Sequence, residues 1–221
     1  MADFEIARVK MVENQLRANK VTDTLLIDAM RLIPREYFVP NARRSVAYAD
    51  EDLSLGGDRW LMEPMLFGRL AQLARVQKED LVLDVGAGMG YGAAVLGQLA
   101  SAVVALEEDA DLVQAATEAL NELEGGRADN IVVQEGPLTE GWTGQAPYDV
   151  IMCEGGLEMR PDALLEQLAE GGRLVAMQRD GGGVQRGVIY TKVGATFAKR
   201  AVFDGATPPL PGFQRAPAFT F

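Results

Sequence analysis

Short apolar runs alternate with stretches in which apolar residues return every three or four positions, and this alternation predicts strands and helices in turn. The runs predict strands at residues 81–85, 102–106, 131–134, 148–152, 173–177, 184–191 and 196–203. Helical spacing predicts helices at 4–18, at 23–33, from 64 onwards, at 93–100, at 109–123 and at 161–170. We therefore expect an α/β fold with a doubly wound, mostly parallel sheet, a C-terminal antiparallel pair and an N-terminal helical extension.

Residues 34–61 show neither the apolar runs of a strand nor the spacing of a helix, and they contain several aromatic residues and arginines. A long irregular segment inside a compact domain is more often functional than idle. We expect this segment to face a ligand or a substrate.

The predicted strand at 81–85 runs into a turn with four glycines: Gly86, Gly88, Gly90 and Gly92. Glycine allows backbone paths that side chains obstruct, so a ligand can lie directly on the main chain. The turn departs from the Gly-x-Gly-x-x-Gly dinucleotide fingerprint, since Tyr91 stands at the sixth position. The pattern favours a ligand other than NAD, and a plain tight turn remains the alternative.

Acidic residues stand at the ends of the predicted strands. Asp84 precedes the glycine turn, where it would repel an anion and hold the ammonium of an amino acid. Glu107 ends the second strand ~20 residues beyond the turn, where a carboxylate commonly holds ribose hydroxyls. The alternative for Glu107 is an acidic cluster, with Glu108, at the N-terminus of the next helix. Glu135 follows the third strand and is a candidate acceptor for an adenine amine, or else part of an ordinary acidic turn.

Composition narrows these possibilities. The 221 residues, 48% of them hydrophobic, suit a single domain covering 1–221. The single cysteine, Cys153, excludes an internal disulfide, and no signal peptide or apolar run of ~20 residues is present, so we expect a soluble cytoplasmic protein without membrane contact. A net charge of −11 argues against nucleic acid as a partner. The absence of histidine excludes histidine triads and histidine metal sites, and we expect no metal.

The glycine turn with Asp84 resembles the cofactor loop of the class I S-adenosylmethionine methyltransferases, and a narrower resemblance covers nearly the whole chain. Its segments are 12–17, 34–40, 47–50, 81–92, 146–149 and 167–175. In order and spacing these segments resemble the protein-L-isoaspartate O-methyltransferases. The resemblance implies a Rossmann-like core at 64–221, and a helical extension with a substrate-side loop at 1–63. It also implies S-adenosylmethionine as donor, S-adenosylhomocysteine as product, and methylation of the free carboxylate of isoaspartyl residues in damaged proteins.

Carried over by position, the resemblance assigns Asp84, Gly86, Gly88 and Gly90 to the methionine side of the cofactor, Glu107 to the ribose, and Glu135 and Gly136 to the adenine. We also expect cofactor contacts from the neighbouring Ala87, Tyr91 and Glu108, and from Glu154 after the fourth strand, where the family tends to have small neutral residues. The expected substrate contacts are Tyr48, Arg59 and Leu61.

One segment departs from the family pattern. The signature Thr-Ile-Ser-Gln-Pro is Trp60-Leu61-Met62-Glu63-Pro64 here, so Met62 and Glu63 occupy the catalytic positions. Met62 cannot donate a hydrogen bond, and Glu63 adds a charge that would repel a carboxylate ~5 Å away by roughly 3 kcal/mol at an effective dielectric of 20. Arginines at 43, 44 or 59 could compensate.

Three functions therefore stay open. Isoaspartyl repair leads. A methyltransferase with another acceptor, for which Glu63 or Glu154 would serve as base, is the first alternative. A catalytically silent cofactor-binding protein is the second. The sequence leaves the oligomeric state open and favours a monomer.

Overall fold

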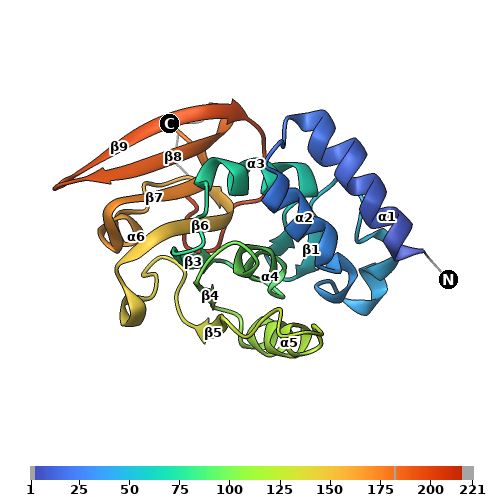
Figure 1. Ribbon diagram of the computed structural model, residues 1–221. Helices are drawn as coiled ribbons and strands as arrows, with labels where there is room; N and C mark the ends of the chain where they lie inside the picture. Colours follow the sequence, from blue (N-terminus) through green and yellow to red (C-terminus); the bar gives the residue numbers. More distant parts are fainter. Residues whose placement is uncertain (1–2, 182, 216–221) are drawn as a thin grey trace.

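The computed structural model describes residues 3–181 and 183–215, and its centre is a seven-stranded sheet (Figure 1). The strand order is β5-β4-β3-β6-β7-β8-β9. The bounds are β3 Leu81–Val85, β4 Ala102–Glu107, β5 Ile131–Glu135, β6 Tyr148–Leu157, β7 Leu168–Arg179, β8 Gln185–Val193 and β9 Thr196–Asp204. Strands β3 to β7 pair in parallel, whereas β8 pairs antiparallel with both β7 and β9. The predicted fold class is confirmed.

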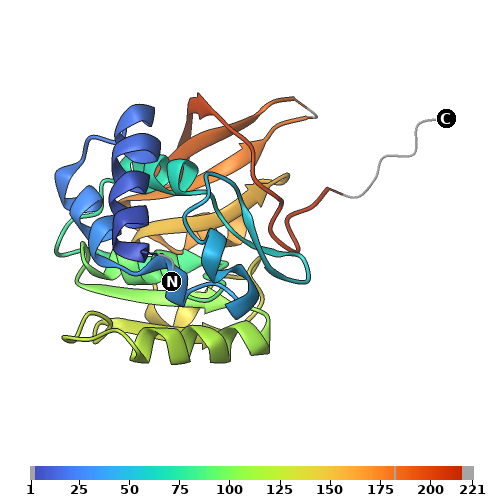
Figure 2. The same cartoon turned by 90° about the vertical axis from the view of Figure 1, so that its right-hand side faces the viewer.

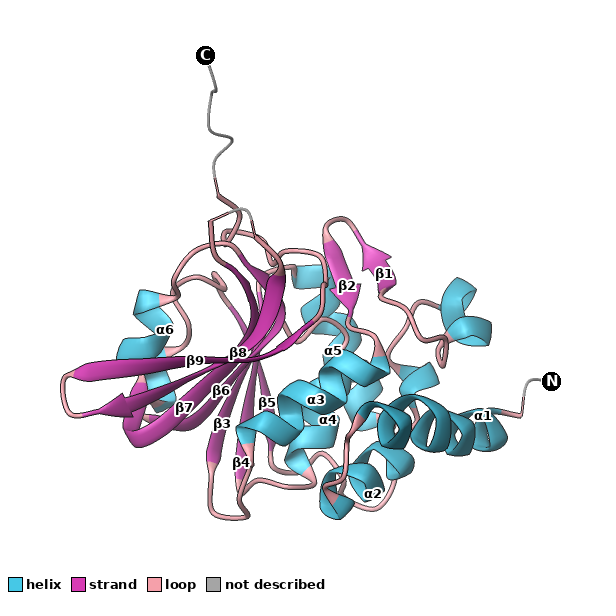
Figure 3. Ribbon diagram, turned by 90° about the horizontal axis from the view of Figure 1, so that it is seen from above, coloured by secondary structure: helices cyan, strands magenta, loops and turns pink. Residues whose placement is uncertain are grey.

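Helices cover the two faces of this sheet (Figure 3). They are α1 Phe4–Met11, α2 Thr24–Leu32, α3 Pro64–Ala74, α4 Tyr91–Gly97, α5 Ala110–Asn121 and α6 Asp162–Glu166. Because successive strand residues point to opposite faces, Val82 joins the core cluster under α3, α4 and α5, while Leu83 joins the cluster on the side of α6. The apolar runs of the sequence are therefore strands buried on both faces, as parallel sheets require.

The register of the strands places the predicted acidic residues at one edge. Asp84 pairs with Ala105 of β4 and with Met152 of β6, and Glu107 pairs with Glu135 of β5. Ligands of open α/β sheets bind at this carboxyl edge.

The first predicted helix, at 4–18, is divided in the structure. The α-helix ends at Met11, a π-helical turn spans Val12–Leu16, and a 3-10 turn spans Arg17–Asn19. The second helix agrees with its prediction, since the Asp23 side chain caps it by accepting from the backbone N–H groups of Leu25 and Leu26.

Other predicted bounds differ too, and the largest differences arise where β6 pairs with β7. The helix predicted at 161–170 ends at Glu166, because β7 begins early where Leu168 pairs with Tyr148 of β6. The strand predicted at 148–152 continues to Leu157, since Gly156 and Leu157 still pair with β7.

The segment expected to be irregular contains a hairpin. After 3-10 turns at Arg35–Tyr37 and Asn41–Val46, strand β1 Leu53–Gly56 pairs with β2 Arg59–Leu61. The turn uses Gly56 and Gly57, both at positive φ. The burial alternates along β1, so one side of the hairpin faces the protein.

The chain after β9 crosses the carboxyl edge of the sheet beside this hairpin (Figure 2). We call residues 205–213 the C-terminal strap. Gly156 N–H donates to the Pro208 carbonyl at 2.8 Å, and Leu210 N–H donates to the Gly156 carbonyl at 2.9 Å. The sequence from Pro208 to Phe221 is rich in proline and aromatic residues, which predicts a segment that wraps the surface and not a central strand. The strap lies along the sheet edge, and residues 216–221 of this segment, like Gly182, lie outside the described residues.

Candidate cofactor site

The backbone of the glycine turn has the form that the sequence predicts. Gly86, Gly88 and Gly90 have φ values of 80°, 56° and 93°. L-residues rarely adopt this region, because Cβ approaches the backbone too closely. Gly90 is also the N-terminal cap of α4. A cradle of bare main chain therefore follows β3.

The predicted ribose carboxylate, Glu107, is fully buried. The N–H groups of Gly88 and Glu108 donate to it at 2.8 and 2.9 Å, and Asp109 N–H donates at 3.3 Å. Arg59 of β2 adds a two-pronged contact, with Nη2 at 2.7 Å from Oε2 and Nε at 3.1 Å from Oε1. Both oxygens of Glu107 are thereby satisfied within the protein.

The partner of Arg59 in the structure differs from the predicted one. The sequence assigns it to a substrate carboxylate, whereas in the structure its guanidinium pairs with Glu107 and is 4% exposed. Nε and Nη2 of this guanidinium are both directed at Glu107 rather than at a ligand.

Asp84 and Glu154 form a second buried acidic pair. The two carboxyls face each other in the interior, and the proton that the pair keeps is shared in a hydrogen bond between them. Burial, reinforced by the charge of Glu107, raises the pKa of Asp84 to about 7. Burial and the neighbouring Asp84 charge raise the pKa of Glu154 well above its usual value. At neutral pH the pair therefore keeps at least part of a proton.

Tyr91 lies in the core rather than on the open side of the cradle. Its ring contacts Phe38 and Phe67 at centroid distances of 5.9 and 5.6 Å. The guanidinium of Arg35 lies 4.7 Å from the ring centroid, and the same side chain donates to the carbonyls of Ala47 and Met62. Arg35, a fully buried cation, is not among the predicted site residues, because nothing in a local sequence pattern indicates burial of an arginine.

The residues predicted to contact the adenine lie together in the open. Glu108, Glu135 and Gly136 line a hollow of about 550 Å³ with Asp109 and Pro137. Glu108 and Glu135 are exposed, and Ala87 is buried beneath the turn.

Among the residues predicted for the substrate and for catalysis, Leu61 and Met62 are buried. Their side chains are apolar, so neither presents a polar group to a ligand. Glu63 is half-buried at the start of α3, and its N–H is held by Asp52 at 2.8 Å. Burial, together with the charges of Asp52 and Asp50, raises the pKa of Glu63 to about 7.

Tyr48, the remaining predicted substrate contact, lies in a polar network with Arg8 and Glu36. Its hydroxyl accepts from Arg8 Nε at 2.8 Å and donates to Glu36. The arginines at 43 and 44 are exposed on their 3-10 turn.

The residue types fit S-adenosylmethionine, but other side chains of the protein lie against part of the expected site. The buried Asp84 carboxyl is suited to an ammonium, and the glycine cradle to a close ligand. However, Leu55, Arg59 and Leu210 lie against the cradle: a Cβ built on Gly86 would stand 2.6 Å from Leu210 Cδ2 and 2.9 Å from Arg59 Nη2. Side chains of the hairpin and of the strap thus lie against the glycine cradle.

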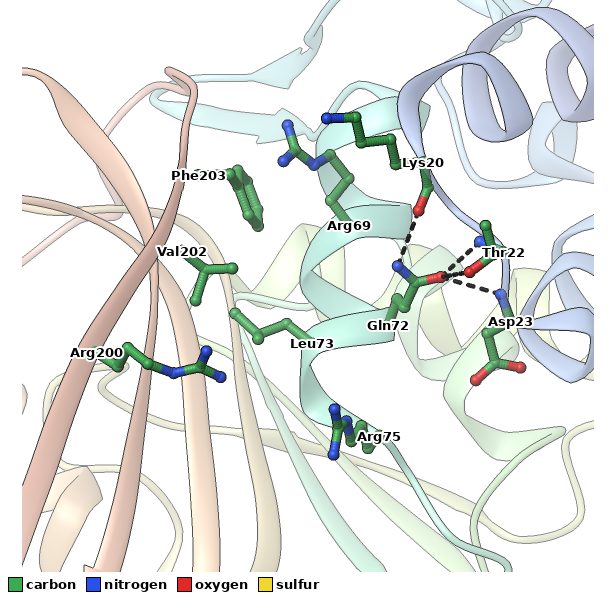
Figure 4. Close-up of a pocket in the computed structure, with 10 residues that line it drawn as sticks. All are labelled: Lys20, Thr22, Asp23, Arg69, Gln72, Leu73, Arg75, Arg200, Val202 and Phe203. Atoms are coloured by element: carbon green, nitrogen blue, oxygen red, sulfur yellow. Dashed lines mark hydrogen bonds between the residues drawn. The ribbon is translucent and has the colours of Figure 1, made fainter.

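A separate basic groove of about 480 Å³ runs along α3 towards its C-terminal end (Figure 4). Its cations are Lys20, Arg69, Arg75 and Arg200. Gln72 orders one wall by accepting from the N–H groups of Thr22 and Asp23. None of the predicted site residues lines this groove.

A doubly wound sheet with a glycine cradle after one strand and a buried carboxylate at the end of the next defines a class I methyltransferase fold. Comparison with known proteins narrows this class. Residues 7–201 match the family model for protein-L-isoaspartate(D-aspartate) O-methyltransferase. The chain belongs to this family.

Individual relatives agree. The chain is 38% identical over 175 residues to protein-L-isoaspartate O-methyltransferase 1 of Syntrophobacter fumaroxidans, covering 79% of this chain and 80% of the relative. It is 37% identical over 205 residues to the Rhodopseudomonas palustris protein-L-isoaspartate O-methyltransferase, covering 92% of this chain and 93% of the relative. The resemblance read from the sequence is confirmed, and the family is S-adenosylmethionine-dependent.

Solved structures show the same fold. One protein-L-isoaspartate O-methyltransferase superposes with a TM-score of 0.80 at 24% identity, over 93% of this chain and 66% of that one. A Plasmodium falciparum protein described as a putative member, solved with S-adenosyl-L-homocysteine, gives 0.75 at 19% identity, over 92% and 97%. Separately, within residues 3–181 and 183–215, no helix combines the length and apolar character needed to cross a bilayer.

Proposed function

We propose that this protein transfers a methyl group from S-adenosylmethionine to the free carboxylate of isoaspartyl residues in damaged proteins or peptides. The observation that carries the proposal is the family match over residues 7–201, with relatives 37–39% identical. When bound, the cofactor supplies an electrophilic methyl group.

The proposed cofactor contacts are those at the carboxyl edge of β3, β4 and β5. Asp84 suits the ammonium, and its burial in β3 just before the glycine turn supports this role. Glu107 suits the ribose once it is released from Arg59. Glu135, Gly136 and Glu108 suit the adenine, because they line one open hollow.

Methylation of a carboxylate acceptor requires little acid–base catalysis from the protein. An ionised carboxylate is already a nucleophile, so the chain has to align it and exclude water. The buried Met62 supplies an apolar wall and no donor, and Glu63 lies beside it with a pKa of about 7. Glu63 in its protonated form would tolerate the acceptor, whereas its ionised form would repel it.

We further propose a monomeric cytoplasmic enzyme, in which residues 1–63 and 64–221 form one domain. The Arg59–Glu107 pair, which links these two parts through buried charges, supports a single unit. The net charge of −11 supports proteins, and neither nucleic acid nor membrane, as partners.

The test is methyl transfer from labelled S-adenosylmethionine to an isoaspartyl peptide, compared with its aspartyl twin of the same sequence. We expect label in the isoaspartyl peptide alone, as a base-labile methyl ester. Transfer to other acceptors alone would contradict the repair function, and absence of transfer to any acceptor would contradict the methyltransferase function.

A further inference from the structure

Three side chains from two separate segments lie against the glycine turn. Leu55 and Arg59 come from the β1–β2 hairpin, and Leu210 comes from the C-terminal strap. A Cβ built on Gly88 would stand 2.6 Å from Leu55 Cδ1, and one built on Gly155 would stand 2.7 Å from Leu210 Cγ. These atoms take up the space next to the glycines that side chains would otherwise fill and that a ligand lying on the bare main chain would need.

The polar half of this arrangement is the pair of Arg59 and Glu107. The carboxylate that would accept ribose hydroxyls is already in a two-pronged ion pair at 2.7 and 3.1 Å. Both side chains are 5% exposed or less. A neutral hydroxyl is a weaker partner for a buried carboxylate than a guanidinium, so a nucleoside has to compete with a strong internal ligand.

The apolar half is the strap. Its backbone is held on both sides of Leu210: Thr207 N–H donates to Gln185 Oε1 at 2.6 Å, and Glu158 N–H donates to the Phe213 carbonyl at 3.0 Å. Leu210 itself is fully buried. The strap is therefore built into the sheet edge and holds Leu210 over Gly86 and Gly155.

We infer that the chain carries its own occupant of the cofactor pocket: Arg59 and Leu210 hold the pocket closed, and a nucleoside binds only when the hairpin and the strap move away. This inference rests on the proposed function and adds its regulation. Affinity for the nucleoside is then reduced by the fraction of molecules that are open.

Two substitutions test the inference, one in the Arg59–Glu107 pair and one in the strap. Arg59→Gln removes the charge and one prong while leaving an amide that can still bond to Glu107. Leu210→Ala removes the atoms nearest to Gly86 and keeps the strap backbone. Matched controls are Arg173→Gln, which breaks the 2.6 Å pair with Asp80, and Leu164→Ala, which truncates an equally buried leucine under α6.

The first measurement is calorimetry with S-adenosylhomocysteine on the full chain. We expect weak binding by the unaltered protein, at least about tenfold tighter binding by each pocket variant, and no gain in either control. Equal affinity in the unaltered protein and both pocket variants would overturn the closure and leave the proposed function intact.

The second measurement needs no nucleoside. Hydrogen exchange of residues 53–61 and of the Gly88 N–H, which is bonded to Glu107, is expected to be faster in Leu210→Ala than in the unaltered protein or Leu164→Ala. Unchanged exchange would overturn the closure whether or not the nucleoside binds. Faster exchange without nucleoside binding in any variant would support the closure and contradict the proposed function.

Discussion

Arg59 and Glu107 are 48 positions apart in the sequence, yet Nη2 of one lies 2.7 Å from Oε2 of the other in the interior of the protein. The pair fastens the β1–β2 hairpin to the end of β4. Removing one member leaves the other charged and buried, which is costly even where backbone donors remain.

We predict that Arg59→Ala lowers the free energy of unfolding by about 3 kcal/mol. Denaturant unfolding measures this loss. The exposed pair of Arg186 and Asp204 provides the comparison, since Arg186→Ala should cost less than about 1 kcal/mol. The double variant Arg59→Met with Glu107→Leu should recover much of the loss, because neither charge is then stranded. A loss for Arg59→Ala as small as that for Arg186→Ala would show that the buried pair does not form in solution.

The buried acids at the sheet edge predict a pH dependence of stability. The pKa values of Asp84 and Glu154 are raised in the folded state, so the folded protein binds more protons than the unfolded chain. Their favourable contribution is present below pH 4 and is lost as the pH rises towards about 7. We predict that stability falls between pH 5 and pH 8, and that Glu154→Gln reduces this fall.

Chemical denaturation at the two pH values checks this, with the exposed Glu140→Gln as control. Glu154→Gln should be more stable than the unaltered protein at pH 8. A variant that is less stable at pH 8 and unchanged at pH 5 would mean that Glu154 is held ionised by a favourable partner.

The sequence predicted the framework of this protein well and its closed pocket not at all. Strand β3 was predicted with its observed bounds, and Glu107 was placed at the end of β4, because apolar runs and glycine turns are local signals. The β1–β2 hairpin was missed, since its strands are only four and three residues long.

The contacts that close the pocket depend on distant segments. Arg59 was assigned to a substrate because a local pattern does not reveal which carboxylate an arginine meets. Leu210 belongs to a segment that was expected only to wrap the surface, and its burial over Gly86 follows from pairing between the strap and the extended β6. Such long-range pairing has no period in the sequence.

Glu63 should oppose a carboxylate acceptor in a pH-dependent manner. Its pKa of about 7 means that it is largely neutral at pH 6 and largely ionised at pH 8. We predict that Glu63→Gln raises kcat/KM for an isoaspartyl peptide by about fivefold at pH 8, corresponding to ~1 kcal/mol for a partly exposed pair of like charges. The gain should be smaller at pH 6. An equal gain at both pH values would attribute the effect to shape rather than charge.

Restoring the serine of the family signature at position 62 tests the second difference from that signature, the loss of a hydroxyl. Adding Met62→Ser to Glu63→Gln supplies a hydroxyl donor beside the acceptor, and we predict a further rise in kcat/KM for the isoaspartyl peptide. Because Met62 is buried, the double variant should also be less stable by about 2 kcal/mol. Activity is therefore compared at a temperature where circular dichroism shows both proteins folded. Unchanged activity in the folded double variant would discard the missing hydroxyl as a limitation.

The most direct test is the initial rate of methyl transfer to an isoaspartyl peptide as a function of S-adenosylmethionine concentration, for the unaltered protein and for Leu210→Ala. We predict transfer by both proteins to the isoaspartyl peptide and not to its aspartyl twin, with a KM for S-adenosylmethionine at least about tenfold lower in Leu210→Ala. Absence of transfer by both proteins, or equal transfer to the two peptides, would contradict the account.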